Sequence, residues 1–195
     1  MPPKLTAWST AWQRLHPKWE MRVWHECKDG VIEANGVQFT SQYPELLARS
    51  CHLSQRSNIW RYELVNQFGG VYLDTDMEPL RPIDGLLANV QAFTSLIVSA
   101  RGNKSRVCSG CSVFGSIAKH PWMSDLVAQL KTRDVAINGS LDSPYLTMMS
   151  TDHPEVTRFE PGVFSAHNKV SGGYAIHHWS SRWWPGSFKQ LGATS

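Results

Sequence analysis

Asp74 and Asp76, separated by Thr75, follow directly on a short hydrophobic run, and this spacing could hold a metal ion. Residues two apart on a strand point to the same face, so both carboxylates can aim at one point where the strand ends. Mg²⁺ and Mn²⁺ are usually held by one or two carboxylates together with water and phosphate oxygens. The pair therefore predicts a site for Mn²⁺ or Mg²⁺ whose open positions a diphosphate could fill.

Two other structures could account for this acidic pair. A calcium-binding loop also needs glycine at its sixth position and glutamate at its twelfth, but these positions hold Pro79 and Gly85. A solvated turn after an edge strand would suit Pro79 and Pro82. The calcium loop is thus excluded, and the residues upstream favour a metal site over a simple turn.

A helix is predicted upstream of the acidic pair, from Gln55 to Phe68, because apolar residues cover most of its circumference and Gly69 can end it. On this helix Asn58 and Arg61 are three residues apart and therefore share a face. A buried arginine needs an anionic or hydrogen-bonding partner. That partner could be Glu63, a strand carbonyl, or a bound sugar or phosphate, and spacing alone leaves all of these open.

These segments resemble a known family. Residues 57–62 (SNIWRY) and 69–76 (GGVYLDTD) are similar to the S-D-x-x-R-Y … G-G-x-Y-x-D-x-D signature of the family-32 glycosyltransferases with a DXD sugar-binding region. The composite signature is far more specific than either part. Weaker similarity to family segments continues at Trp12–Glu20 with Arg22–Trp24, at His120–Trp122, at Ser143–Thr147, and at Ala175–Trp179 with Arg182 and Trp183.

The resemblance implies a fold and an activity. The fold would be α/β, a GT-A-like nucleotide-diphospho-sugar transferase fold with a mixed, mostly parallel sheet flanked by helices, in one catalytic domain over residues 1–195. The activity would be the retaining transfer of a hexose from a nucleotide-diphosphate sugar, such as a UDP- or GDP-hexose, to a hydroxyl acceptor on a glycan, lipid or protein.

The resemblance also implies a metal centre. Asp76, with Asp74 directly or through water, would hold Mn²⁺ or Mg²⁺. His177, the histidine of the closing motif, would be a third metal ligand or a contact to the diphosphate, and His178 is the alternative. The implied catalytic residues are Asp74, Asp76 and Arg61.

The implied donor site draws on further positions. Asn58 and Arg61 stand where the family binds the donor sugar, and Tyr72 and Asp74 belong to the same contact set. Trp183 would stack near the diphosphate or the sugar.

Three departures from the family pattern bear on activity. Asn58 replaces an aspartate and carries no charge, so donor preference or turnover should differ, and Arg182 replaces a serine. The usual first strand, which lines the nucleotide base, has no counterpart between Met1 and Trp12. These departures motivate an alternative function, a non-catalytic sugar- or nucleotide-binding module. The edge left by the absent strand would also favour a homo-oligomer.

Composition sets the remaining expectations. A chain of 195 residues suits a single domain. A dispersed net charge of +3 gives no support for nucleic-acid binding. No apolar run is long enough for a membrane span and no signal pattern opens the chain, so we expect a cytoplasmic protein. A compact member of this family suits a bacterial or bacteriophage source.

The cysteines suggest a more distant alternative, a zinc-binding structural protein. Cys108 and Cys111 form a C-x-x-C pair, but no second pair exists and Cys51-His52 is distant in the sequence. A redox motif should open a helix, whereas this segment has the pattern of a strand. Free, buried thiols are therefore expected. Of the nine tryptophans, Trp179, Trp183 and Trp184 are the candidates for stacking on a sugar.

Two further carboxylates, Asp142 and Asp152, could assist the reaction, but the spacing of neither one marks it as catalytic, and both are expected in solvated loops.

Hydrophobic periodicity predicts alternating helices and strands, with a polar loop at 99–106. The predicted helices are Leu5–Leu15, Tyr43–Ser50, Gln55–Phe68, Ile83–Leu87, Pro121–Lys131 and Ser143–Met149. The predicted strands are Glu20–Trp24, Gly70–Leu73, Gln91–Val98, Val107–Phe114, Val156–Phe159 and Gly173–His177.

Overall fold

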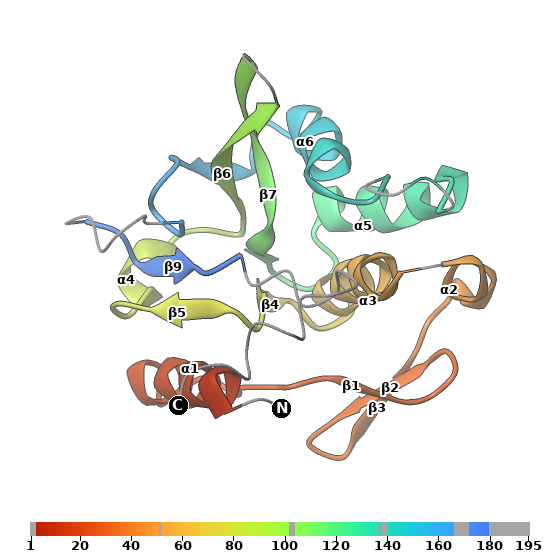
Figure 1. The fold of residues 1–195 in the computed structure, drawn as a ribbon, viewed down its shortest axis with the longest axis horizontal. Helices are drawn as coiled ribbons and strands as arrows, with labels where there is room; N and C mark the ends of the chain where they lie inside the picture. The colour runs from red at the N-terminus through yellow and green to blue at the C-terminus, as the bar shows by residue number, and fades with distance from the viewer. Residues whose placement is uncertain are drawn as a thin grey trace, which may run out of the picture.

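The computed structural model describes residues 3–50, 52–101, 104–135, 137, 140–165 and 172–179. It has a mixed α/β architecture built on a four-stranded sheet, with helices packed against it (Figure 1). The strand order is β4-β7-β6-β8. The bounds of these strands are β4 (Gly70–Leu73), β6 (Ala92–Arg101), β7 (Lys104–Ser116) and β8 (Thr157–Phe159). The α/β class expected from the sequence is therefore confirmed.

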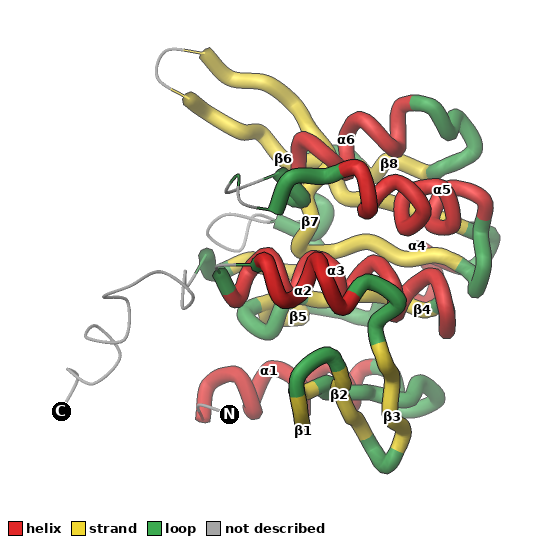
Figure 2. Tube along the Cα trace, turned by 90° about the vertical axis from the view of Figure 1, so that its right-hand side faces the viewer, coloured by secondary structure: helices red, strands yellow, loops and turns green. Residues whose placement is uncertain are grey.

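The expectation of a mostly parallel sheet is wrong. β4 pairs with β7 and β6 pairs with β7, both antiparallel, and only β6 and β8 run parallel. No helix lies between β6 and β7, so the two strands form one long hairpin that projects beyond the helices (Figure 2). Residues 99–101 and 104–106, predicted as part of a loop, extend these two strands, because backbone pairing continues from the pair Ser99–Arg106 to the pair Arg101–Lys104.

A small antiparallel sheet near the amino terminus replaces the predicted strand Glu20–Trp24. It consists of β1 (His25–Lys28), β2 (Val31–Ala34) and β3 (Val37–Thr40). Asn35 and Gly36, in the turn between β2 and β3, have φ values of 51° and 77°. An Asn-Gly pair with positive φ at both positions is the usual sequence of a tight hairpin turn.

Every helix predicted from the sequence is present, with small changes at the ends. The bounds are α1 (Pro3–Leu15), α2 (Pro44–Arg49), α3 (Leu53–Phe68), α4 (Asp84–Leu87), α5 (Pro121–Gln129) and α6 (Ser143–Thr151), and a 3₁₀ turn at Leu130–Thr132 follows α5. Two strands outside the main sheet, β5 (Met77–Pro79) and β9 (Ala175–His177), pair with each other, and β5 was not predicted.

Two hydrophobic clusters cover opposite faces of the main sheet. Phe114 on β7 belongs to the cluster that α3, α5 and α6 form. Its neighbour Val113 belongs to a second cluster, which includes Trp12 of α1 and Met77 of β5. Successive residues of a strand face opposite sides, so the two clusters lie on either side of β7. Figure 1 shows α1 below β5, and α3, α5 and α6 on the other side of β7.

A glycine turn leads from α3 into β4 and so towards the acidic pair. The Gly69 N–H donates to the carbonyl of Val65 at 2.9 Å and ends the helix. Gly69 has φ 69°, and a Cβ there would lie 2.7 Å from the backbone nitrogen of Ala118. Both the backbone conformation and the close approach require glycine.

Within the described ranges, no helix combines the length and the apolar character needed to cross a bilayer.

The close approach of β4 and β7 gives a testable prediction. A Cβ on Gly115 of β7 would lie 2.6 Å from the Gly70 carbonyl oxygen and 2.7 Å from the ring of Phe93. We expect Gly115→Ala to lower the free energy of unfolding by about 1–3 kcal/mol, because the strands must separate to admit the methyl group. The control is Gly85→Ala in α4, where nothing lies within 4 Å of the new Cβ. Urea unfolding of both variants measures the difference, and equal stabilities would contradict this packing.

Candidate metal centre and donor pocket

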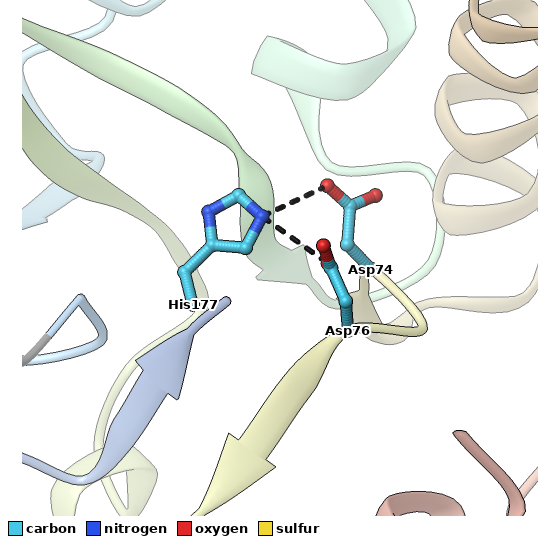
Figure 3. Close-up of side chains that lie close together, drawn as sticks. All are labelled: Asp74, Asp76 and His177. Atoms are coloured by element: carbon cyan, nitrogen blue, oxygen red, sulfur yellow. Dashed lines mark ion pairs between the residues drawn. The ribbon is translucent and has the colours of Figure 1, made fainter. Parts of the chain in front are cut away.

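The acidic pair lies in the turn between β4 and β5 rather than on a strand. The Asp74 N–H donates to the carbonyl of Ser112 at 2.9 Å, which holds the turn against β7. The Met77 N–H then donates to the carbonyl of Asp74 at 3.1 Å and closes the turn. Figure 3 shows the carboxylates of Asp74 and Asp76 projecting from this turn towards one region.

The imidazole of His177 joins the two carboxylates. β9 pairs antiparallel with β5, with His177 opposite Met77, so the histidine lies beside the acidic turn. Its Nε2 is 3.2 Å from Asp76 Oδ1 and 3.9 Å from Asp74 Oδ2 (Figure 3). One ligand atom from each residue lies within 4.8 Å of the other two. Within the described residues this is the one group of three or more such side chains with that spacing.

His178, the alternative third ligand, points elsewhere. Its Nε2 lies 2.7 Å from Glu78 Oε2, and its ring stacks on Trp8 with 4.4 Å between ring centroids. Its backbone N–H donates to the carbonyl of Asp76 at 3.1 Å, which ties the chain after β9 to the acidic turn. The geometry therefore selects His177 over His178 as the third candidate ligand.

Arg61 contacts Asp74 from α3. Its Nη1 lies 3.3 Å from Asp74 Oδ1 and donates to the carbonyl of Cys111 at 2.7 Å. Its remaining contacts are to Ser57, through the backbone carbonyl and the hydroxyl. A strand carbonyl and a carboxylate are thus its partners, whereas Glu63 accepts hydrogen bonds from Ser41 and Gln42 instead.

The guanidinium of Arg61 stays protonated although the side chain is buried. Burial is the largest single influence on its pKa and lowers it, but the neighbouring ionisable groups, of which Tyr72 and Asp74 have the largest effects, together make the net shift of the pKa upward. The guanidinium carbon also lies 4.5 Å from the centre of the Tyr72 ring. Arg61 is therefore a fixed positive charge against Asp74.

Tyr72 holds the same carboxylate. Its hydroxyl donates to Asp74 Oδ1 at 2.7 Å. Burial and the neighbouring Asp74 raise the pKa of Tyr72, so the hydroxyl keeps its proton and remains a donor. Tyr72 and Arg61 together occupy Oδ1, which leaves Oδ2 of Asp74 facing His177. Tyr72 is thus positioned to orient Asp74, and its predicted contact with the donor stays a prediction.

Asn58 has a partner that sequence reasoning missed. Its side-chain nitrogen donates to the carboxylate of Asp142, at the start of α6. Asp142 was expected in a solvated loop, but α6 packs on β7 and α5, the hydrogen bond to Asn58 places Asp142 against α3, and Asp142 is half-buried. The predicted stacking residue Trp183 lies outside the described residues, as do Arg182 and Trp184.

A large cavity adjoins the acidic turn. It has a volume of about 1020 Å³ and is lined mainly by apolar atoms. Arg61, Tyr72 and Asp74 lie on its wall, as do the indoles of Trp12 and Trp60. All four residues of β4 line the cavity, and β4 is an edge strand of the main sheet among the described residues.

The three candidate ligands fit a divalent cation. Two carboxylate oxygens and one imidazole nitrogen form a donor set that divalent metals accept in proteins. The side chains of Asp76 and His177 are 11% and 6% exposed, whereas that of Asp74 is 26% exposed and faces the cavity. The Nδ1 of His177 has no hydrogen-bond partner among the described residues, and the imidazole also contacts the Trp179 ring, with 3.9 Å between ring centroids.

The cysteine pair forms no comparable site. No third side chain of a ligand-forming type joins Cys108 and Cys111 in the part of the chain that the structure describes. Both cysteines are free thiols on β7, and Ser143 approaches the Cys111 sulfur at 3.9 Å. The structure gives no support to the zinc-binding alternative.

The mixed α/β fold, with its acidic turn beside a cavity, is consistent with a glycosyltransferase domain of the GT-A-like class. Residues 2–93 match the family described as a glycosyltransferase sugar-binding region containing a DXD motif. This segment includes Asn58, Arg61 and the acidic pair. The chain therefore carries a family-32-like glycosyltransferase region, and the resemblance found in the sequence is confirmed.

A characterised relative extends the comparison beyond this segment. The chain is 28% identical over 165 residues to inositol phosphoceramide mannosyltransferase 3 of Schizosaccharomyces pombe. The alignment covers 84% of this chain and 41% of that protein, so the chain spans well under half the length of its relative. The expected bacterial or bacteriophage source stays a prediction.

Metal titration tests the third ligand. We expect His177→Ala to weaken Mn²⁺ binding by about tenfold or more, because a side chain at the centre of the donor set is removed. His178→Ala is the matched control, since its imidazole contacts Glu78 and not the aspartates. Isothermal titration calorimetry with Mn²⁺ alone gives both affinities. If both variants bind Mn²⁺ as tightly as the wild type, His177 is not a ligand.

Thiol labelling tests the environment of the cysteines. Burial raises the pKa of the Cys111 thiol to about 11 and also raises the pKa of Cys108. The reactive form is the thiolate, so at about pH 8 we expect iodoacetamide to modify the exposed Cys27 and to leave both β7 cysteines unmodified in the folded protein.

The labelling is done in a Cys51→Ser background, because Cys51 lies outside the described residues. Mass spectrometry of peptides with and without denaturant reports each site. Rapid labelling of Cys111 in the native protein would contradict the packing of β7 against α3 and α6.

Proposed function

We propose that the chain is a metal-dependent glycosyltransferase that moves a hexose from a nucleotide-diphosphate sugar to a hydroxyl acceptor, with retention of configuration at the anomeric carbon. The observation that carries this proposal is the convergence of Asp74, Asp76 and His177 beside a cavity of about 1020 Å³. The match of residues 2–93 to a DXD sugar-binding region supports the same conclusion.

The metal would be Mn²⁺ or Mg²⁺, held by Asp74, Asp76 and His177. When bound, it would offset the negative charge that develops on the leaving diphosphate. Arg61 and Tyr72 fix one oxygen of Asp74 and leave the other for binding. The chain thus supplies a carboxylate whose orientation is set before the donor arrives, which reduces the cost of assembling the site.

Retention follows if the acceptor attacks from the face that the leaving group departs. The bond between the anomeric carbon and the diphosphate oxygen breaks, and a bond to the acceptor oxygen forms. The proton of the acceptor hydroxyl passes to the departing phosphate oxygen. This route needs no separate protein base, which agrees with a triad in which every carboxylate is directed towards a ligand position.

The cavity wall suits the nucleotide part of the donor. The indoles of Trp12 and Trp60 and the ring of Tyr72 lie along it, so flat aromatic surfaces are available beside the site. The relative's name assigns it mannose as the sugar and inositol phosphoceramide as the acceptor. Mannose is therefore the first hexose to test, and a lipid hydroxyl joins glycan and protein hydroxyls among the acceptors.

A donor panel tests the proposed function. We expect Mn²⁺-dependent release of nucleotide from one of several UDP- and GDP-hexoses, GDP-mannose included, and loss of that release with EDTA. Asp76→Asn should lower turnover by at least about 100-fold, because a metal-binding charge is removed while the shape is kept. The control is Asp125→Asn, whose carboxylate is 64% exposed and contacts His153, which is not part of the triad.

The outcomes separate the two candidate functions. Donor binding that raises the melting temperature with Mn²⁺, without any turnover, would favour the non-catalytic sugar- or nucleotide-binding module that Asn58 suggests. The absence of both binding and turnover would overturn the proposal. Turnover that Asp76→Asn leaves intact would show that the reaction occurs elsewhere in the molecule.

A further inference from the structure

Asp142 immediately precedes α6 in the position that caps the first turn of the helix. An aspartate there normally accepts a hydrogen bond from the backbone N–H of the second or third helical residue. Asp142 makes no such side-chain bond, although its backbone carbonyl accepts from Tyr145 and Leu146. Its carboxylate accepts from the side-chain nitrogen of Asn58 instead. The carboxylate of Asp142 is therefore directed towards α3 and does not cap α6.

Asn58 and Arg61 direct two carboxylates from one face of α3. Arg61 contacts Asp74 at 3.3 Å, and Asn58, three residues earlier, contacts Asp142. Residues three apart on a helix are neighbours on its surface. Asp142 thus lies on the Asn58 side of Arg61, next to the residues that line the cavity but not among them.

Cys111 on β7 contacts both Arg61 and the residue that follows Asp142. Its carbonyl accepts from Arg61, and its sulfur lies 3.9 Å from the hydroxyl of Ser143, the residue after Asp142. Burial is the main cause of the raised pKa of Cys111, and the charges of Asp74 and Asp142 both add to the shift, against the opposing effect of Arg61. Both carboxylates are therefore close to one side chain.

The contact with Asn58 leaves the carboxylate of Asp142 only partly satisfied. An ionised carboxylate has two oxygens and can accept about four hydrogen bonds. Among the described residues, Oδ1 accepts from Asn58 and Oδ2 has no partner. Asn58 is 2% exposed, so its amide cannot turn to solvent and keeps Asp142 in place. The free oxygen of a half-buried carboxylate is a ready acceptor for a hydroxyl group.

We propose, resting on the proposed glycosyl transfer, that Asp142 supplies the sugar-binding charge that the family signature carries at position 58. Asn58 positions this carboxylate, and Asp142 Oδ2 accepts a hydrogen bond from a hydroxyl of the donor hexose. In this chain position 58 is an uncharged asparagine, and the negative charge is instead supplied from the start of α6, by the residue that contacts Asn58 on α3. Asp142 acts as a specificity-determining residue for the sugar and not for the nucleotide.

Three variants test this source of the charge. Asp142→Asn keeps an oxygen that can accept from Asn58 and removes the charge. Asn58→Asp places a second carboxylate against Asp142. The double variant Asn58→Asp/Asp142→Asn returns the charge to position 58, with an amide now on α6. The melting temperature of each variant reports whether the contact between the helices survives.

Calorimetry with Mn²⁺ compares two probes, the nucleotide-hexose that the donor panel selects and its nucleoside diphosphate. We expect Asp142→Asn to weaken binding of the nucleotide-hexose by about tenfold or more, because a hydrogen bond to a charged group is lost. Binding of the nucleoside diphosphate should stay within about twofold, since it has no hexose to contact Asp142. The double variant should recover most of the loss, to within about threefold of the wild type. A purely structural role would lower both affinities together.

The inference is overturned if Asp142→Asn binds the nucleotide-hexose as the wild type does, or if the double variant is no better than Asp142→Asn. Either result leaves the proposed function intact as long as the wild type turns over its donor. If the wild type binds no nucleotide-hexose in the panel, the proposed function itself is wrong. In that case the variants and the wild type show the same lack of nucleotide-hexose binding, and this result is distinct from the two above.

Discussion

The buried guanidinium of Arg61 is the interaction on which the site depends. It joins α3 through Ser57, β7 through the Cys111 carbonyl, and the acidic turn through Asp74. A buried charge is tolerated only with close partners, and leaving one unpaired costs roughly 3–5 kcal/mol. The same contacts that satisfy Arg61 therefore fix the distance between the helix, the sheet and the carboxylate. Asp74 cannot move away without leaving a buried cation short of a partner.

The helix α3 extends this arrangement in both directions. Tyr62 lies next to Arg61, is buried, and donates from its hydroxyl to the carbonyl of Leu141, which ties α3 to the segment before α6. Gly69 ends the helix and directs the chain into β4. The signature residues of the sequence thus serve two purposes. They hold α3, β4 and α6 together, and they present polar groups to the same side of the helix.

Much of the fold and of the candidate site could be predicted from local patterns. The helices follow from apolar periodicity, and the acidic pair follows from its spacing and its flanks. The pairing direction could not be obtained this way, because the segment 99–106 has loop composition, and yet residues 99–101 and 104–106 continue the β6–β7 hairpin. The hairpin signal at Asn35-Gly36 was present, but the flanking strands are short and partly polar, so periodicity did not mark them. Asp142 was missed because its contact with Asn58 joins residues 84 positions apart.

The pairing of β9 with β5 has a consequence for how the molecule assembles. Glu78 and His178, at the two ends of this contact, are 100 positions apart in the sequence. The strands share only the short register from Met77–His177 to Pro79–Ala175, so closing this long loop is entropically costly and is repaid by few backbone bonds. During synthesis the two aspartates leave the ribosome well before the histidine. A cation held by all three side chains would bind β9 to the acidic turn. The concentration of the cation and the pairing of β9 with β5 would then be thermodynamically linked.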